Sequence, residues 1–296
     1  MDSHHRAPSR IDRAQILKRA TAIGVLGAGA SGAPRIMAAL CDPRIDAREV
    51  QCLLHKEPAL SARVLRVANS PYYGQSRSIT TLDRALVILG LEAVRGIAAA
   101  ACLDRTMSRG MDQSPIDMPA LLQHSLATAA AAESLARIRS PALASDAFIA
   151  GLLHNLGILV QMNIDSPGIM AMIELRRAGD NRDMRALERE NASVGHEECI
   201  AVIFEAWEMP ESLIAAARHH HDPMAAVELH RTLASLINLG ADLGLANGST
   251  FTLEPLPVAR NTPAVAWLGL DEGQVDAVAT ALPERVADLK HALLGA

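Results

Sequence analysis

The sequence predicts an all-α protein, and three observations lead to this fold class. Hydrophobic residues make up 50% of the 296 positions but aromatic residues only 2%, so alanine and aliphatic side chains must fill the core. Alanine and leucine lose little conformational freedom in a helix, whereas strands favour β-branched and aromatic side chains. Apolar residues recur at helical spacing along most of the chain, with no alternating strand pattern. We therefore expect a multi-helix bundle at residues 119–247 with an N-terminal helical block, residues 11–110, packed against it.

The N-terminal block begins after a polar tail at residues 1–10, which we expect to be disordered. Asp12 and Asp46 are placed to cap helices, because an aspartate side chain accepts hydrogen bonds from first-turn amides. Proline fits the first turn of a helix, so Pro34 and Pro58 mark two further starts. The predicted helices run from Asp12 toward Ile23, over Arg35–Leu40, over Ala47–His55, from Pro58 to about Asn69, and from Thr81 or Asp83 to about Met107.

The second block follows a linker at residues 108–118 that is rich in Gly, Pro, Ser and Asp. Its predicted helices are Pro119–Ile138, Ser145–Asn163, Pro167–Ala178, Ser193–Ala206, Glu211–His219 and Pro223–Ala246. Residues 248–296 form a C-terminal segment, in which a proline-containing loop from Gly248 to Pro263 precedes a helix from Asp271 toward Leu294.

The charge balance argues against general nucleic-acid binding. Lys and Arg number 28 against 33 Asp and Glu, which gives a formal charge of −5. A general nucleic-acid binder needs a basic surface for the phosphates, and a single-strand binder also needs aromatic side chains on which bases stack. This chain has neither in its composition.

The cysteines and apolar runs indicate a cytoplasmic protein that does not bind membranes. None of the four cysteines forms a C-x-x-C pair, so the pattern is neither a zinc ribbon nor a thioredoxin-like motif. The polar N-terminus has no apolar signal core. No uncharged apolar run looks long enough to span a bilayer; the nearest, Phe148–Met162, is interrupted by His154 and Asn155.

A glycine motif near the N-terminus resembles a dinucleotide fingerprint. Gly27, Gly29 and Gly32 fit the pattern G-x-G-x-x-G. That motif binds pyrophosphate only between a strand and a helix of a βαβ unit. Residues 43–47 do not read as a buried strand, so we expect a flexible connection between two helices and no bound NAD or FAD.

Histidines fall in four groups, each on a different predicted helix. They are His124, His154 followed by Asn155, His196, and the run His219, His220 and His221. A helical bundle can bring inward-facing side chains from separate helices to one point, and imidazole ligates several first-row metals. Each histidine alone would be read as a core or capping residue. Four groups on apolar helices favour a shared site.

At this point the sequence resembles the HDOD family, a branch of the HD superfamily related to HD-GYP phosphodiesterases. The similar segments, spread over about residues 20–245, are Asp42-Pro43, Glu57–Ser70, Tyr73-Gly74, Ala85–Gly90, His124-Ser125, Gly151–Gly157, Gly195-His196, Trp207–Glu211 and Arg218–His221. The resemblance implies an HD-hydrolase-like helical bundle and a bacterial signalling or regulatory role. It also implies a divalent metal such as Fe, Mn, Zn or Ni. The implied ligand positions are His124, His154, Asn155, His196, and His219 or His220.

The sequence departs from the HD pattern at its central pair, which is His154-Asn155 instead of His-Asp. An asparagine oxygen can ligate a metal but does not offset its charge. The superfamily places another aspartate on a late helix, where Asn238 and Asp242 are both candidates. Because two-metal hydrolysis depends on closely held cations, we expect the site to be degenerate. We assign no catalytic and no cofactor-binding residue.

Three functions follow from this reading. The first is a signalling module without hydrolase activity that contacts proteins of two-component or cyclic-dinucleotide systems. The second is a metal-dependent phosphodiesterase acting on a nucleotide second messenger. The third is a small-ligand sensor that uses the degenerate site. A basic stretch around a predicted loop is the expected contact for an anion or an acidic partner, and it comprises Arg176, Arg177, Arg182, Arg185 and Arg189.

Overall fold

The computed structural model describes residues 12–30, 36, 39, 42, 44–69, 78–108, 115–254 and 262–294. Helices account for nearly all the regular structure in these ranges, and the one extended pairing there is a bridge between Phe251 and Glu254. The predicted all-α class is confirmed. The tail at residues 1–10 and most of the predicted helix Arg35–Leu40 lie outside the described residues.

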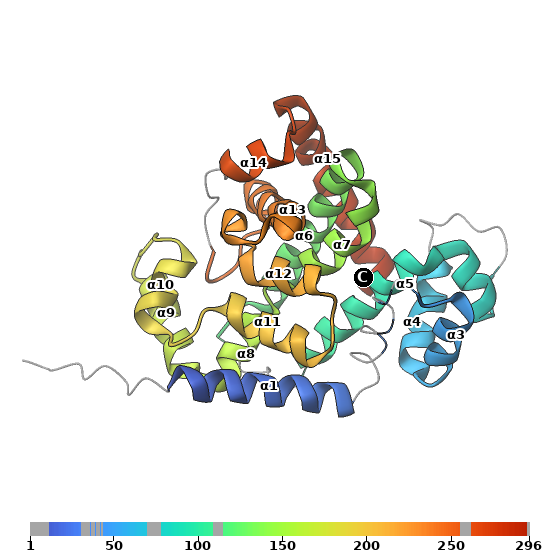
Figure 1. Cartoon of the computed structure of the whole chain (residues 1–296), viewed down its shortest axis with the longest axis horizontal. Helices are drawn as coiled ribbons and strands as arrows, with labels where there is room; N and C mark the ends of the chain where they lie inside the picture. The colour runs from blue at the N-terminus through green and yellow to red at the C-terminus, as the bar shows by residue number, and fades with distance from the viewer. Residues whose placement is uncertain are drawn as a thin grey trace, which may run out of the picture.

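The N-terminal block consists of α1 (Arg13–Ala30), α3 (Ala47–His55), α4 (Pro58–Ala68) and α5 (Leu82–Ser108). Asp46 caps α3 through a reciprocal capping box with Glu49, and Pro58 opens α4 as the sequence indicated. Gly90 has a φ of +73°, which bends α5 and suits a residue without a Cβ atom. Helices α3, α4 and the first part of α5 form one end of the molecule, while α1 runs beneath α11 and α8 (Figure 1).

Helix α6 (Met118–Arg139) is central to the bundle, between α7 (Ala144–Leu153) and α13 (Glu228–Ala246). Small residues allow this close packing. A Cβ atom on Gly151 would lie 2.9 Å from the Cα of Ala129, and one on Gly240 would lie 2.9 Å from the carbonyl oxygen of Thr128. The tight packing brings the inward faces of three helices to one place.

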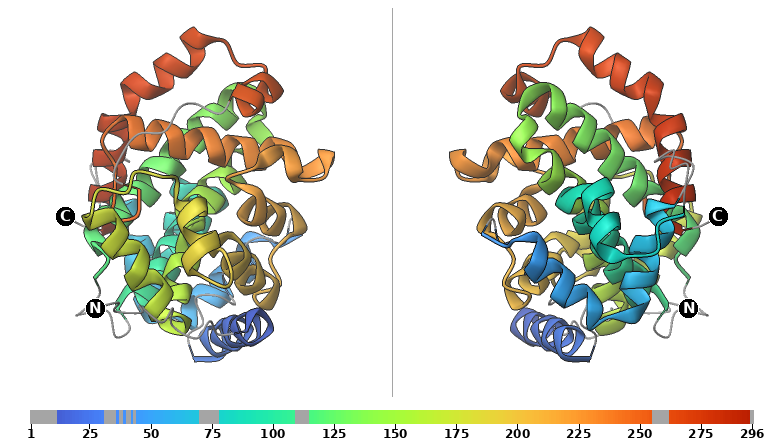
Figure 2. Two further views of the ribbon diagram at one scale, coloured as in Figure 1. Left: turned by 90° about the vertical axis from the view of Figure 1, so that its left-hand side faces the viewer. Right: turned by 90° about the vertical axis from the view of Figure 1, so that its right-hand side faces the viewer.

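The remaining elements surround this centre. They are α8 (Leu156–Ile164), α9 (Ser166–Arg177), α10 (Met184–Asn191), α11 (His196–Ala206), α12 (Glu211–His219), α14 (Thr262–Leu268) and α15 (Glu272–Leu294), with short 3-10 turns at Pro141–Leu143 and Pro223–Ala225. Helix α15 packs along α6, and α14 lies at the opposite end of the molecule from α1 (Figures 1 and 2).

Two sequence-based helix boundaries were wrong. The glycine motif is not a flexible connection up to Ala30, because α1 continues through Gly27 and Gly29. A helix at these glycines is also unlike the strand–turn–helix of a dinucleotide site. The predicted single helix Ser145–Asn163 is two helices, α7 and α8, separated by a turn at His154 and Asn155. This turn places the candidate metal ligands His154 and Asn155 between the two helices instead of on the face of one helix.

Two predicted loops contain structure. The basic loop between α9 and α11 holds the helix α10, whose Asp183 cap accepts a hydrogen bond from the backbone amide of Ala186 (2.9 Å). The loop from Gly248 to Pro263 contains the turn Phe251–Glu254, and α14 begins inside its predicted range. Residues 255–261 of that loop lie outside the description.

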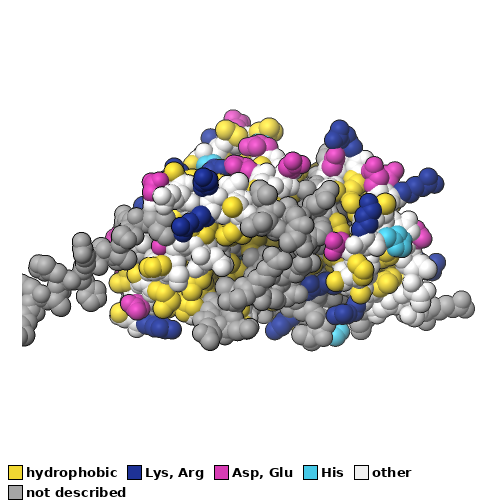
Figure 3. Space-filling model, turned by 90° about the horizontal axis from the view of Figure 1, so that it is seen from below, with side chains coloured by type: hydrophobic (Ala, Val, Ile, Leu, Met, Phe, Trp, Pro, Cys, Tyr) yellow, Lys and Arg dark blue, Asp and Glu magenta, His cyan; other side chains and the backbone are white. Residues whose placement is uncertain are grey.

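One helical stretch, Pro141–Ile164, is long and apolar enough to cross a membrane by length and composition, contrary to the sequence expectation. Its most apolar window is 78% buried inside the fold, and the turn at His154 and Asn155 interrupts it. Burial by other protein elements is the property of a core helix. On the face shown in Figure 3, basic and acidic side chains are interspersed, without a broad surface of one sign.

Candidate metal centre

Four buried histidines from separate elements form a row inside the bundle. His124 lies on α6, His154 follows α7, His196 begins α11 and His220 follows α12. Ring centroids are 5.3 Å apart from His124 to His154, 5.1 Å from His154 to His220, and 5.1 Å from His220 to His196. The tertiary structure thus brings together side chains that are up to 96 positions apart in the sequence.

Each of these rings is held through its Nδ1 atom. The Nδ1–H groups of His124, His154 and His220 donate to the carbonyl oxygens of Ser249 (2.9 Å), Gly151 (2.7 Å) and Ala217 (2.7 Å). Nδ1 of His196 donates to the carboxylate of Glu188 at 2.9 Å. Because carbonyl and carboxylate oxygens only accept, the neutral rings keep their lone pairs on Nε2. Such outer hydrogen bonds are what orients histidines toward a metal.

The closest group of nitrogen atoms belongs to His196, His220 and His221. Nε2 of His196 lies 3.1 Å from Nε2 of His220 and 3.2 Å from Nε2 of His221. Two lone pairs at this separation repel unless a proton or a cation lies between them. Metal–nitrogen bonds of about 2.0–2.1 Å place neighbouring ligand atoms about 2.9–3.4 Å apart, so these three residues fit a divalent metal.

Burial sets the protonation of the cluster. Burial lowers the pKa of His124 to about 4 and lowers the pKa values of His154, His220 and His221 well below the usual range. Burial also acts to lower the pKa of His196, but the adjacent Glu188 carboxylate outweighs it and raises that pKa to about 9. In the metal-free protein, His196 therefore carries the proton that its Nε2 shares with His220 and His221. A metal would replace that proton.

The asparagine of the central pair is buried, and its side chain has no hydrogen-bond partner. Asn155 is 2% exposed, and neither its Nδ2 nor its Oδ1 atom is paired. Asn238 donates from Nδ2 to the carbonyl oxygen of His220 (2.8 Å), so it supports that turn, while its Oδ1 is unpaired. Asp242, one turn further along α13, faces the cavity beside the cluster.

His219 does not join the cluster. It is partly exposed at the end of α12, whereas the next two residues turn inward with His220 and His221. The sequence analysis included His221 in the run of three histidines but not among the ligand positions implied by the family resemblance. It also missed Glu188, Glu197 and Glu254, which come from stretches that read as solvent-exposed helix or loop.

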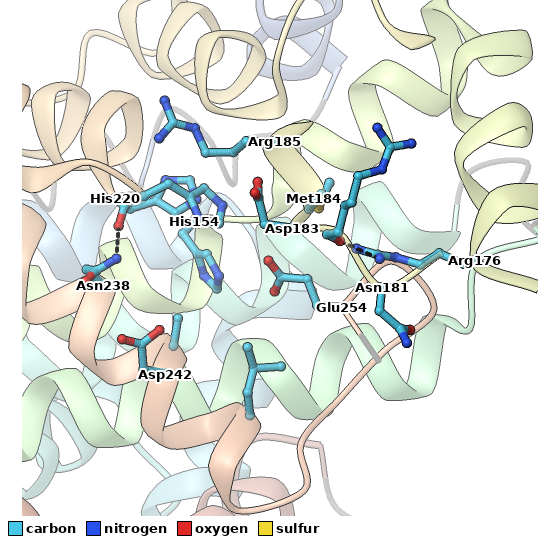
Figure 4. Close-up of a pocket in the computed structure, with 14 residues that line it drawn as sticks. His154, Arg176, Asn181, Asp183, Met184, Arg185, His220, Asn238, Asp242 and Glu254 are labelled. Carbon is cyan, nitrogen blue, oxygen red and sulfur yellow. Dashed lines mark hydrogen bonds between the residues drawn. The ribbon is translucent and has the colours of Figure 1, made fainter. Parts of the chain in front are cut away.

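A cavity of about 190 Å³ opens beside the histidines. Figure 4 shows His154, His220, Asp242 and Glu254 around it, with Arg176 at its far side. Burial raises the pKa of Glu254 to about 7. The small volume would admit a metal with water or a compact anion.

Two of the five arginines that were expected to contact an anion or an acidic partner, Arg176 and Arg182, make contacts within the fold. Arg176 donates to the carbonyl oxygens of Leu253 (2.8 Å) and Asp180 (2.7 Å). Arg182 pairs with Asp180 and Glu190. These contacts fix the loop between α9 and α10 over the cavity, a structural role that the sequence reading did not assign.

The buried histidine row within a helical bundle defines the class of protein as HD-like. Residues 30–223 match the model of the HDOD domain, so the chain belongs to the HDOD family. The matched range lies within the 20–245 expected from the sequence, and it ends before Asn238, Asp242 and Glu254.

Known proteins resemble this chain in sequence and in fold. The chain is 26% identical over 203 residues to a protein of Treponema pallidum (strain Nichols), which covers 68% of this chain and 39% of that protein. A crystal structure from Geobacter sulfurreducens described as an HDOD domain protein has a TM-score of 0.75 at 21% identity, covering 96% of this chain and all of that one. A candidate signal transduction protein from Marinobacter aquaeolei VT8 has a TM-score of 0.72 at 25% identity, covering 87% and 56%. The chain thus spans little more than half of the Marinobacter protein and less than half of the Treponema protein.

Proposed function

We propose that this chain is a signalling module that binds a divalent metal through His196, His220 and His221 and does not hydrolyse phosphodiesters efficiently. The observation that carries this proposal is the neutral, unpaired Asn155 at the centre of the site. Two-metal hydrolysis uses cations about 3.5–4 Å apart that clamp the attacking and leaving oxygens. Holding two dications so close calls for an anionic bridge, which Asn155 does not provide.

His196, His220 and His221 would hold this ion, since Nε2 of His196 lies 3.1 Å from Nε2 of His220 and 3.2 Å from Nε2 of His221. When bound, the metal supplies a positive charge and a Lewis-acid centre for a ligand in the adjacent cavity. Glu188 positions His196, and the backbone carbonyl of Ala217 positions His220. The chain's residues therefore build a rigid anchor that orders the ends of α11 and α12.

The signal would pass through protein contacts, with two-component or cyclic-dinucleotide signalling proteins as the expected partners in the cytoplasm. The relative from Marinobacter aquaeolei VT8, described as a candidate signal transduction protein, supports this direction. Val87 on α5 and Leu229 on α13 are more than 80% exposed, so apolar contact points are available. The free thiols of Cys52 and Cys199 suit a reducing compartment.

A small-ligand sensor is the second candidate, and the cavity of about 190 Å³ beside the cluster favours it. In that case a compact anion would bind next to the metal. Metal binding without hydrolysis of a phosphodiester is compatible with this second candidate, whereas robust hydrolysis is not.

The experiment combines elemental analysis with an assay of cyclic-di-GMP and a generic phosphodiester, using protein loaded with Mn, Fe or Zn. We expect at least one ion per chain, with one of them at the His196, His220 and His221 position, and no robust turnover. Asn155→Asp restores a carboxylate at the centre, so activity gained only in this variant would support the proposal. Robust turnover by the unmodified protein, lost in His154→Ala, would make it a phosphodiesterase.

A further inference from the structure

An unassigned carboxylate faces the other end of the histidine row, where the C-terminal segment meets α6. Glu254 closes the turn Phe251–Glu254, in which the backbone of each terminal residue hydrogen-bonds to the other (3.0 and 3.2 Å). The turn lies beyond residues 30–223, the part that matches the family. The side chain of Glu254 is only 12% exposed and lines the cavity with His154 and Asp242 (Figure 4).

A titratable nitrogen close to this carboxylate belongs to His124. Because Nδ1–H of His124 donates to the carbonyl oxygen of Ser249, its Nε2 carries a lone pair. That Nε2 is fully buried and has no hydrogen-bond partner, and it lies 3.9 Å from Oε2 of Glu254. The ring of Phe251 covers the imidazole, with centroids 5.1 Å apart.

This pair is unfavourable without a cation between its atoms. A separation of 3.9 Å is too long for a hydrogen bond, so a shared proton does not join the two groups. A buried polar atom left unpaired is destabilising, and a lone pair that faces a carboxylate adds repulsion. An imidazole nitrogen and a carboxylate oxygen are a common ligand pair for Zn²⁺ and similar ions.

We propose that Glu254 is a metal ligand contributed by the C-terminal segment and that it shares a cation with His124. The inference rests on the proposed function in treating the histidine row as a metal centre. His124 stands at the opposite end of the row of ring contacts from His196 and His221. The His124–Glu254 position therefore adds a second, terminal ion and does not replace the bridging carboxylate that Asn155 lacks.

A cation at this position would tie the Ser249–Glu254 stretch to the bundle. The same stretch is already held by Ser249, which accepts from His124, and by Leu253, whose carbonyl oxygen accepts from Arg176. Metal occupancy is then coupled to the order of the segment that leads into α14 and α15. A signalling module could use this coupling to report the state of its metal centre.

The test titrates Zn²⁺ alone into the full chain after chelator treatment and compares wild type with Glu254→Gln. Glu205→Gln is the matched control, because it removes a carboxylate from α11 that pairs with Arg218 at the surface, away from the histidine row. We expect Glu254→Gln to bind about one zinc ion fewer per chain than wild type and the control. We also expect zinc to slow hydrogen exchange of residues 249–254 in wild type but not in Glu254→Gln.

Unchanged zinc stoichiometry together with unchanged zinc-induced protection in Glu254→Gln would overturn the proposal. His124→Gln is a second variant, with the same expected loss of one ion, in case the first does not fold by circular dichroism. Failure of the proposed function would be seen in a different measurement. Turnover of phosphodiesters by wild type would contradict the proposed function, but it would leave the difference in zinc count between wild type and Glu254→Gln unchanged. Loss of the ion in His220→Ala with retention of the Glu254-dependent ion would separate the two positions.

Discussion

His124 is a neutral imidazole held where water does not reach, and its titration links the site to the stability of the fold. Its pKa is lowered to about 4 by burial, whereas an unfolded histidine titrates near 6.5. Since the folded pKa lies below the unfolded one, the unfolded chain binds more protons between these values. The contribution of His124 to the free energy of unfolding is therefore fully present above about pH 6.5, and it is lost as the pH falls toward 4.

This residue gives a prediction for the metal-free protein. Between pH 7 and pH 4.5, the free energy of unfolding should fall by about 2 kcal/mol on account of His124 alone. The measurement is urea denaturation at both pH values in the presence of a chelator, for wild type and His124→Gln. The variant should lose less stability over this range, because glutamine does not titrate; an identical loss in both proteins would contradict the expectation.

The asparagine at position 155 shows what a single residue changes. The four buried histidines are arranged as for a metal, because each Nδ1 atom is hydrogen-bonded and Nε2 is left as the ligand atom. Asn155 occupies the turn between α7 and α8, and its side chain makes no hydrogen bond there. Asn155 carries no charge, although the surrounding histidines are arranged as for a metal. For this reason we propose that the site binds a metal and does not hydrolyse phosphodiesters efficiently.

At the scale of elements, the approach of α8 to α11 determines where His196 lies. A Cβ atom on Gly157 would lie 2.0 Å from the backbone carbonyl oxygen of His196 and 3.1 Å from the amide nitrogen of Ile200. Backbone atoms do not yield as a flexible side chain does, so the two helices would have to separate. Glycine at this position is thus a packing requirement of the site.

We expect Gly157→Ala to destabilise the protein by about 1–3 kcal/mol, the range for overpacking a core, and to weaken zinc binding by moving His196. The matched control is Gly273→Ala in α15, where the nearest atom to a new Cβ is a side-chain oxygen of Asp271 at 3.3 Å. That control should be neutral or stabilising, because alanine favours helix. Thermal unfolding and zinc titration check both variants, and equal behaviour would refute the packing role.

The whole molecule should respond to metal as a single cooperative unit, because the histidines come from α6, α7, α11 and α12. A ligand that binds only the folded state stabilises it by about 2.7 kcal/mol at a hundredfold excess over its Kd. For a chain of this size, that corresponds to a rise in Tm of several degrees.

The corresponding prediction is that zinc raises the Tm of wild type by about 5 °C or more, reversibly with a chelator. His220→Ala should retain at most part of this shift, because it removes a ligand of the three-histidine position. Differential scanning calorimetry makes the comparison, and a full shift in His220→Ala would exclude that position as the main zinc site.

The sequence alone determined the all-α class, the family and most helix boundaries. These depend on local chemistry: apolar spacing, caps such as Asp46, and prolines such as Pro58 act within a few residues. The histidine positions at 124, 154, 196 and 220 were also visible, since each lies in a distinctive short segment.

Only the tertiary structure decided which side chains share the site. His220 and His221 turn inward while His219 does not, because α12 ends there and the chain changes direction. Glu188 and Glu254 reach the cluster from α10 and from the turn after α13, elements whose sequences give no sign of burial. Local pattern specifies a helix and its apolar face, but the atoms that meet at a metal centre depend on how distant helices pack.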